Sequence, residues 1–296
     1  MKTTKGVLLF AHNNEEIDYI KIAYVNALMI KKNLRVGVTL VTDEGTADWA
    51  RETIGQKQMQ HAFEHVIIKD RDYVYQQKNI RIYKDTKTKI TRLPFYNCDH
   101  WMAYDLTPYD ETLFIDADYL IMSDALNNCW GSNQDIMINK NIREILDGRQ
   151  TESPTLDTFG IDLYWATCIY FKKTEVAKHM FSLAHYVYDN YTYFRDLYQF
   201  PGSLFRNDFA FSIAVHMMNG FNETGLIKEL PIAAIYKSFD HDDIISINGI
   251  NDITLLLEKE TKYVEFLPTR WHNIDIHIMN KYAIVRHADA LVELYT

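Results

Sequence analysis

The order of the hydrophobic segments in the first 70 residues is the feature that most limits the fold of this chain. Apolar runs of strand length occur at residues 6–11, 36–41 and 65–68, and stretches with helical spacing, such as 16–32, lie between them. Runs without polar alternation are typical of strands that are buried on both faces, as in a parallel sheet covered by helices. The alternation of strand and helix therefore predicts an α/β fold with a Rossmann-like, mostly parallel sheet flanked by helices.

The rest of the chain continues this pattern without a repeat or a linker. The further elements that we predict are a loop or hairpin at 71–92, a helix at 96–106, a strand at 112–115, a strand at 165–171, and helices at 175–194 and 207–218. Asn207 and Asp208 are expected to cap the last of these helices. We predict one domain, 1–296, made of two halves, 1–122 and 123–296.

Composition narrows the possible partners. The formal net charge of −9 argues against nucleic acid as the main partner, because tight binding to a polyanion needs a basic surface. Cys98, Cys129 and Cys168 form an odd set without paired spacing, so neither a disulfide framework nor a zinc site is expected. No apolar run reaches the roughly 18 residues of a membrane span. These features predict a cytoplasmic protein without membrane contact.

The pattern Asp116-Ala117-Asp118 follows the apolar strand at 112–115. Side chains alternate along a strand, so both carboxylates are expected on one face. Burying two neighbouring carboxylates is costly without a cation, and Mn²⁺ or Mg²⁺ commonly joins such carboxylates to phosphate oxygens. The alternative is a solvated strand end with turn or capping aspartates. The position at the end of a fourth buried strand favours a metal-diphosphate site.

Polar residues also follow the earlier strands. His12 and Asn13 come directly after the first strand, Asp43 follows the second, and Asp70 follows the third. Ligands of parallel α/β sheets bind beyond the carboxyl ends of the strands. We therefore expect these four residues at the same rim as the two aspartates. By contrast, we interpret the acidic run at 240–243 as a solvated loop.

The segment from Leu106 to Leu120 resembles the core of the GT-A nucleotide-sugar glycosyltransferases. It is most similar to the retaining, glycogenin-like group and to related bacteriophage proteins, and the resemblance extends in register along most of the chain. It implies a GT-A fold with a C-terminal acceptor subregion. It also implies metal-dependent transfer of a hexose or pentose from a nucleotide-diphosphate sugar to an acceptor hydroxyl, with retention of configuration. The residues expected from it to contact the donor are Ala11, His12, Asn13, Asp43, Arg92, Asp116, Ala117 and Lys281.

Three later segments extend the resemblance. Trp165-Ala-Thr-Cys stands where the family usually has an Asn-Ser/Ala-Gly pattern, so the donor-sugar contact differs here. Asn207 and Asp208 resemble the catalytic acidic/amide pair near the anomeric carbon. The C-terminal region would supply a third metal ligand beside Asp116 and Asp118, either His277 or His287, and a phosphate-binding Lys281 or Arg286. The alternatives remain a helix cap for Asn207 and Asp208, ordinary structural histidines, and a surface position for Arg92.

Other functions are compatible with parts of this pattern. The resemblance to phage proteins allows a transferase that glycosylates modified, hydroxymethylated pyrimidines in phage DNA, acting in the host cytoplasm. A nucleotidyltransferase is disfavoured, because the loop after the first strand reads His12-Asn-Asn-Glu15 and is not rich in glycine. A non-catalytic protein that binds nucleotide sugars is the remaining alternative. The acceptor is a saccharide, a protein or modified DNA, and a homodimer is possible.

Overall fold

The structure is a computed structural model that describes a large part of the chain. The described residues are 4–70, 79–86, 88–140, 142–145, 155–156, 160–200, 202, 204–220, 225–237, 244–260 and 264–296. The acidic run at 240–243 and residues 71–78 of the predicted loop lie outside them.

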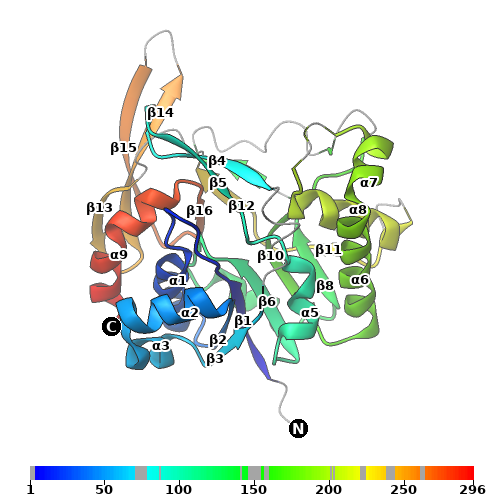
Figure 1. The fold of residues 1–296 in the computed structure, drawn as a ribbon, viewed down its shortest axis with the longest axis horizontal. Coiled ribbons are helices and arrows are strands. Elements are labelled where there is room, and N and C mark those ends of the chain that lie inside the picture. The colour runs from blue at the N-terminus through cyan, green and yellow to red at the C-terminus, as the bar shows by residue number, and fades with distance from the viewer. Residues whose placement is uncertain are drawn as a thin grey trace.

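A seven-stranded sheet forms the centre of the molecule (Figure 1). Its strands, in spatial order, are β11 (Lys228–Glu229), β8 (Ile136–Asn139), β10 (Trp165–Lys172), β6 (Glu111–Asp116), β1 (Lys5–Phe10), β2 (Gly37–Thr42) and β3 (His65–Ile68). The neighbours from β6 to β3 are parallel, β10 is antiparallel to both of its neighbours, and β11 is parallel to β8. The predicted α/β fold with a mostly parallel sheet is confirmed.

Helices flank this sheet, and their bounds follow. They are α1 (Tyr19–Asn33), α2 (Glu44–Ala50), α3 (Gln56–Ala62), α5 (Ala103–Leu106), α6 (Glu175–Asp189), α7 (Tyr191–Tyr198), α8 (Asn207–Asn219) and α9 (Lys281–Tyr295), with a π-helical turn η1 (Arg51–Gly55) and two 3-10 turns, η2 (His100–Met102) and η3 (Ala125–Cys129). None of the helices in the described part of the chain is long and apolar enough to cross a membrane.

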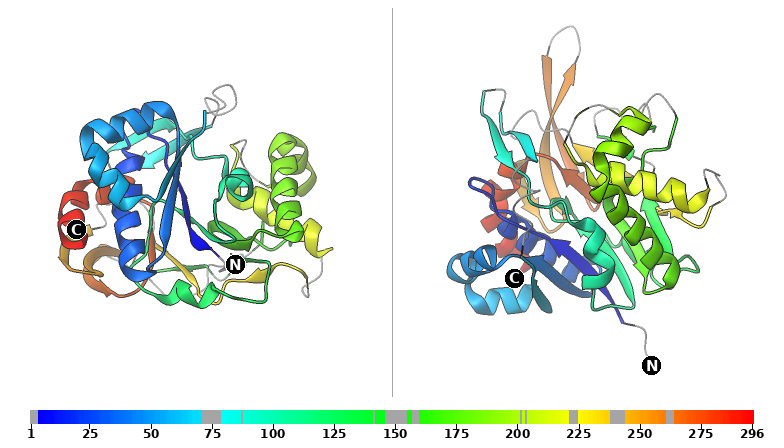
Figure 2. Two further views of the ribbon diagram at one scale, coloured as in Figure 1. Left: turned by 90° about the horizontal axis from the view of Figure 1, so that it is seen from below. Right: turned by 45° about the vertical axis from the view of Figure 1, so that its right-hand side comes forward.

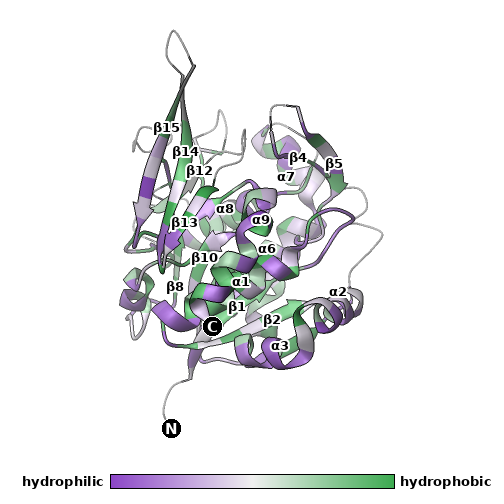
Figure 3. Cartoon of the chain, turned by 90° about the vertical axis from the view of Figure 1, so that its left-hand side faces the viewer, coloured by the Kyte–Doolittle hydropathy of each residue, from purple (hydrophilic) through white to green (hydrophobic). Residues whose placement is uncertain are grey.

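The central strands are apolar throughout because both faces of the sheet are covered. In β1, Val7 and Leu9 pack in one core with α1 and α9, whereas Leu8 and Phe10 pack in the other core with α6 and α8. Figure 2 shows these two groups of helices on opposite sides of the sheet. In Figure 3, β1 and β2 are hydrophobic, while the outer helix α3 is largely hydrophilic. Gly6 in β1 has no room for a side chain, because the Tyr109 ring would lie 2.3 Å from an added Cβ.

Two predicted helices differ from their expected bounds, because one starts later than expected and the other is divided in two. The segment 96–106 is helical only from His100, as η2 and α5. The predicted helix at 175–194 is divided into α6 and α7 at Asn190. Local spacing did not reveal either break, because apolar residues continue through both segments at intervals that a helix could use.

Three smaller sheets lie around the central one. The hairpin of β4 (Ile80–Lys84) and β5 (Ile90–Pro94) confirms one of the two alternatives for this segment. A four-stranded sheet contains β7 (Tyr119–Leu120), β16 (Ile276–Ile278), β12 (Ala234–Lys237) and β9 (Ile142–Glu144). A three-stranded antiparallel sheet contains β13 (Ile244–Gly249), β14 (Asp252–Glu260) and β15 (Val264–His272), and the last two strands project from the body in Figure 1. The pattern of residues at 244–272 does not predict this sheet.

Candidate functional site

The two aspartates lie where the central sheet ends. Strand β6 ends at Asp116, and Asp118 follows in a turn rather than in the strand. The prediction that strand alternation places the two side chains on one face is therefore wrong, because Asp118 is not part of the strand. Both carboxylates nevertheless line the same cavity. Phe10, the last residue of β1, is the partner of Asp116 in the parallel pairing. The carboxyl ends of β1 and β6 thus meet at the acidic pair, as the general rule for such sheets predicts.

The short strand β7 brings a distant segment to the second aspartate. It begins at Tyr119, directly after Asp118, and pairs with β16 so that Tyr119 lies opposite His277. The backbone N–H of Ile278 donates to the carbonyl oxygen of Asp118 at 3.0 Å. As a result, Nε2 of His277 lies 3.0 Å from Oδ2 of Asp118. Single ligand atoms of Asp116, Asp118 and His277 all lie within 4.8 Å of one another.

The polar atoms of this set are buried and lack well-formed hydrogen bonds among the described residues. This holds for both ring nitrogens of His277 and for Oδ2 of Asp118, whose contacts with His277 and Lys281 are ion pairs. Buried polar atoms without partners are rare and usually indicate a missing ligand, water or ion. Two carboxylates and an imidazole are ligands that Mn²⁺ accepts, so the residues present fit a divalent cation.

A lysine completes the surroundings of Asp118. The Nζ atom of Lys281, the first residue of α9, lies 2.5 Å from Oδ2 of Asp118. Burial alone would raise the pKa of Asp118, but the interactions with His277 and Lys281 outweigh it and lower the pKa below its usual range. Asp118 is therefore held as a carboxylate, the form that a cation binds.

The surroundings of Asp116 act in the opposite direction. Burial, followed by the negative charges of Asp118 and Asp208, raises its pKa well above the usual range. Its Oδ1 lies 3.5 Å from Nε2 of His100. Burial lowers the pKa of His100 to about 3, so this imidazole is neutral near pH 7 and does not balance the charge of Asp116. A second positive charge would be needed to keep both aspartates ionised.

The start of α8 provides the other wall of the cavity. The residue that caps this helix is Arg206, without a side-chain hydrogen bond, so the predicted capping by Asn207 and Asp208 is wrong. Both side chains instead bond to other segments, because Oδ1 of Asp208 accepts from the backbone N–H of Ala166 at 3.0 Å and Nδ2 of Asn207 donates to the carbonyl oxygen of Asn97 at 3.1 Å. These bonds turn the two side chains toward the acidic pair.

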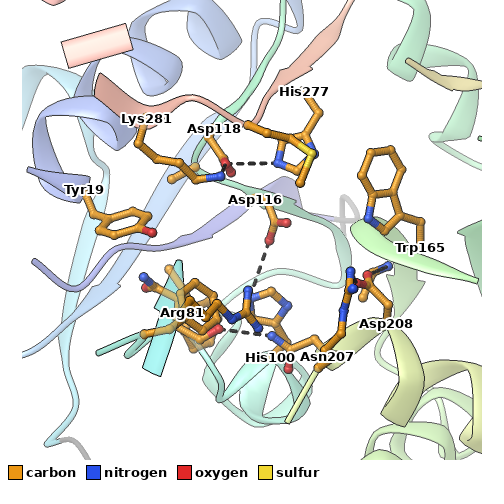
Figure 4. Close-up of a pocket in the computed structure, with 17 residues that line it drawn as sticks. Tyr19, Arg81, His100, Asp116, Asp118, Trp165, Asn207, Asp208, His277 and Lys281 are labelled. Atoms are coloured by element: carbon orange, nitrogen blue, oxygen red, sulfur yellow. Dashed lines mark hydrogen bonds and ion pairs between the residues drawn. The ribbon is translucent and has the colours of Figure 1, made fainter. Parts of the chain in front are cut away.

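A cavity of about 100 Å³, here called the acidic cavity, lies between these groups (Figure 4). Its lining residues are Phe10, Tyr19, Arg81, Phe95, Asn97, His100, Asp116, Ala117, Asp118, Trp165, Ala166, Arg206, Asn207, Asp208, His277, Met279 and Lys281. The Trp165 ring stands near His277, with ring centroids 5.1 Å apart. The cavity therefore combines the candidate metal ligands with aromatic and amide side chains.

A second cavity, here called the cationic cavity, adjoins the first and measures about 520 Å³. It is lined by Tyr19, Ile80, Arg81, Ile82, Tyr83, Lys84, Arg92, Phe95, Leu204, Arg206, Met279 and Lys281. Five of these described residues are cationic and none is acidic, although the whole chain carries a net charge of −9. Lys281 and Arg81 line both cavities. Such a concentration of positive charge favours a polyanionic ligand beside the acidic pair.

The structure brings only part of the predicted site together. Asp116, Ala117, Asp118, Asn207, Asp208, His277 and Lys281 line the acidic cavity, and Arg92 lines the cationic one. His287 lies on α9, where its Nε2 is 2.8 Å from the carbonyl oxygen of Ile244, and it does not line the acidic cavity. Arg286 forms an ion pair with Asp85 at 2.8 Å. Of the two histidines that the sequence left open, His277 is the one beside the acidic pair.

The predicted donor contacts after the first two strands have structural partners. Asp43 caps α2, where its Oδ1 accepts from the backbone N–H of Thr46 at 2.9 Å. Ala11 is buried, and its N–H donates to Val41. Asn13 lies in a separate surface hollow with Trp49. None of these three residues, nor His12, is part of the described lining of the acidic cavity, and their donor contacts stay predictions.

Several lining residues had no signal of function in the sequence. Asn97 and His100 lie in the segment before α5, and Arg81 lies on β4. His12 holds Asn97 in place, because its backbone N–H donates to Oδ1 of Asn97 at 3.1 Å. No spacing marks these residues, since their convergence depends on contacts between segments distant in the sequence. Trp165 and Arg206 lie within segments on which the resemblance rests, but no role was predicted for them.

Comparison with known proteins gives similarity in structure alone. No family model matches the chain, and no curated protein matches its sequence. The glycosyltransferase GlyE of Streptococcus pneumoniae TIGR4 is similar over 78% of this chain and 46% of its own, with 9% identity and a TM-score of 0.45. The galactosyltransferase LgtC, solved with donor and acceptor sugar analogues, is similar over 78% of this chain and 73% of its own, with 11% identity and a TM-score of 0.44. Mouse xyloside xylosyltransferase 1 is similar over 77% of this chain and 85% of its own, with 12% identity and a TM-score of 0.43. Similarity at this level is too low to assign the activity of these proteins to this chain.

Proposed function

We propose that this protein is a metal-dependent glycosyltransferase that moves a sugar from a nucleotide-diphosphate sugar to an acceptor hydroxyl. The observation that carries the proposal is the convergence of Asp116, Asp118 and His277 in a cavity that adjoins the cationic cavity. A cation beside a concentration of basic side chains suits a ligand with several negative charges, such as a nucleoside diphosphate. Mn²⁺ is the favoured cation, because one of the three ligands is an imidazole.

The donor side of the reaction belongs to the acidic pair and the basic residues. When bound, a divalent cation would neutralise the charge that develops on the departing diphosphate. Lys281 lies between the two cavities, where its ammonium group is placed to donate to a phosphate oxygen. Arg81, Lys84 and Arg92 line the cationic cavity and would hold the rest of the nucleotide by charge-assisted hydrogen bonds.

The start of α8 would act on the transferred sugar and on its acceptor. Asp208 is fixed by the backbone N–H of Ala166 and by Arg206, so its carboxylate has little freedom to turn away. A carboxylate fixed in this place would stabilise the positive charge that develops on the sugar, or orient the acceptor hydroxyl. The resemblance to retaining transferases extends the proposal to retention of anomeric configuration. Proton NMR of the first-formed product tests that part, since an inverted anomeric centre would contradict it.

Thermal unfolding with a panel of nucleoside diphosphates and nucleotide sugars, with and without Mn²⁺, tests the proposal. A ligand that binds only the folded state stabilises it by about 2.7 kcal/mol at a concentration of 100 Kd. We expect one nucleotide to raise the unfolding midpoint of the wild type only when Mn²⁺ is present. The variants Asp118→Ala and His277→Ala should lose this rise, because each removes a proposed ligand.

His287→Ala is the matched control, since it removes the other candidate histidine from the same C-terminal region. It should keep the metal-dependent rise. The proposal is wrong if no nucleotide stabilises the wild type, or if His287→Ala loses the rise while His277→Ala keeps it. Mass spectrometry of the donor then separates an enzyme from a binding protein, because an enzyme consumes the donor by transfer or slow hydrolysis.

A further inference from the structure

Two asparagine side chains in the wall of the acidic cavity are only half satisfied by the protein. Asn97 lies in the segment before η2, and Asn207 is the first residue of α8. Their exposed fractions are 5% and 7%, and both line the cavity together with Asp116. Figure 4 shows Asn207 beside Asp208, on the other side of Asp116 from Lys281. Asn207 therefore lies on the side of the cavity that Asp116 separates from the lysine, and Asn97 lines the same cavity.

Backbone partners fix the orientation of each amide. Oδ1 of Asn97 accepts from the backbone N–H of His12 at 3.1 Å, and a backbone N–H can only donate. Nδ2 of Asn207 donates to the carbonyl oxygen of Asn97 at 3.1 Å, and a carbonyl oxygen can only accept. Neither amide can be turned over without the loss of one of these bonds. The unused groups are therefore Nδ2 of Asn97, a donor, and Oδ1 of Asn207, an acceptor.

Both unused groups are buried and have no hydrogen-bond partner among the described residues. A buried polar group without a partner lowers the stability of a folded protein, because it has lost its hydrogen bonds to water. The protein nevertheless keeps one such donor and one such acceptor in the same cavity wall. A ligand that satisfies both groups would recover this free energy on binding, which makes the pair a candidate recognition element.

The chemistry of the two groups limits what can satisfy them. A phosphate oxygen accepts hydrogen bonds but offers no proton to Oδ1 of Asn207. An ammonium group donates but cannot accept from Nδ2 of Asn97. A hydroxyl group both donates and accepts, so one hydroxyl, or two neighbouring hydroxyls, can satisfy the pair. Phosphate groups are in turn suited to the cationic cavity next to it. The pair therefore favours an uncharged, hydroxylated group beside the acidic pair.

We propose that Asn97 and Asn207 recognise a hydroxyl of the donor's sugar and thereby select which nucleotide sugar the protein uses. This inference rests on the proposed function, because the sugar is placed beside the acidic pair by the diphosphate that carries it. Asn97 contributes the donor, Asn207 contributes the acceptor, and the backbone of His12 keeps Asn97 in the orientation that recognition requires. A sugar that lacks this hydroxyl leaves both amides unpaired and binds more weakly.

Titration calorimetry in the presence of Mn²⁺ tests the proposal with UDP and GDP, each compared with its glucose, galactose or mannose conjugate. The measured quantity is the gain in affinity of the nucleotide sugar over the nucleoside diphosphate alone. Asn97→Asp keeps the size of the side chain and an oxygen for the His12 N–H, but it replaces the donor by a second acceptor. We expect this variant to lose about 10- to 100-fold in affinity for the sugar conjugate and less than about threefold for the diphosphate.

A deoxy donor identifies the hydroxyl and excludes a merely structural role. The conjugate that lacks the recognised hydroxyl should bind the wild type as weakly as the full conjugate binds Asn97→Asp. Asn97→Asp should not weaken the binding of this deoxy conjugate any further. Asn139→Asp is the matched control, because Asn139 is 1% exposed, also has an unpaired amide and lies outside the described cavity lining. It should leave the gain from the sugar unchanged, whatever it does to stability.

The two proposals fail in different ways. If neither diphosphate binds with Mn²⁺, the proposed function is overturned and this inference falls with it. If a diphosphate binds but its sugar conjugates gain nothing, or gain equally in wild type and Asn97→Asp, only the hydroxyl recognition is overturned. The hydroxyl recognition is also overturned if Asn139→Asp and Asn97→Asp change the gain by the same factor.

Discussion

Asp43 shows that one polar residue at the end of a parallel strand allows two different interpretations. Its position after β2 predicts a contact with the donor, but its carboxylate oxygens accept from the backbone N–H and the hydroxyl of Thr46, each at 2.9 Å. These bonds satisfy a donor at the start of α2, which otherwise has no partner within the helix. The observed geometry therefore shows a capping role for Asp43.

The capping role gives a prediction that separates it from ligand binding. Asp43→Ala should lower the free energy of unfolding by about 1 kcal/mol, and Asp43→Ser should restore most of it, because serine is also a good capping residue. Urea denaturation measures both effects. Nucleotide affinity should be similar in the two variants once the protein is folded. A loss of affinity in Asp43→Ser without a loss of stability would show instead that the carboxylate contacts the donor.

At the scale of elements, the antiparallel sheet of β13, β14 and β15 depends on a charged pair at its base. Asp252 begins β14 opposite His272 and accepts from Nε of Arg270 on β15 at 2.9 Å. Hydrogen bonds from Arg270 are the main reason that the pKa of Asp252 is lowered to about 2. The carboxylate form is thus favoured by the folded sheet, and protonation in acid weakens the link between the two strands.

The sign of the resulting pH dependence follows from linkage. The unfolded Asp252 has an ordinary pKa of about 3.9, so the unfolded chain binds the proton first as the pH falls. The stability that this group contributes is complete above about pH 4 and is lost as the pH falls toward 2. We expect the difference in unfolding free energy between wild type and Asp252→Asn to shrink over this range in urea denaturation. Arg270→Gln should show the same trend, whereas a difference that is constant with pH would contradict the assignment.

At the scale of the whole molecule, the candidate site joins a segment from the middle of the chain to one near its C-terminus. Asp116 is the last residue of β6 and Asp118 follows it, whereas His277 and Lys281 belong to β16 and the start of α9. The antiparallel pairing of β7 with β16 holds these two segments side by side. A cation held by Asp116, Asp118 and His277, as proposed, would contact both segments.

Hydrogen exchange followed by mass spectrometry measures this coupling. Addition of Mn²⁺ with the stabilising nucleoside diphosphate should slow exchange in residues 116–122 and 276–281 together, since local opening of either segment would break the site. In His277→Ala, the slowing should disappear from both segments. The projecting strands β14 and β15 serve as an internal reference that should not change. Slowing confined to one of the two segments would show that they do not form one site.

The central fold and the first half of the candidate site can be predicted from the sequence. Uninterrupted apolar runs predict strands buried on both faces, and the order of strand and helix predicts the parallel pairing from β6 to β3. The acidic pair was found because it directly follows one of these strands. Such inferences succeed because they depend on neighbours in the sequence and on one general rule about where parallel strands end.

Which distant residues join that pair depends on contacts between segments that are far apart in the sequence. His277 and His287 are equivalent in the sequence, and the β7–β16 pairing places one beside Asp118 while the helix α9 directs the other to the carbonyl oxygen of Ile244. Asn97 and His100 lack any signal, because their place depends on bonds to His12, Asn207 and Asp116 from other segments. Contacts of this kind are set by how the layers pack, which no local pattern of residues records.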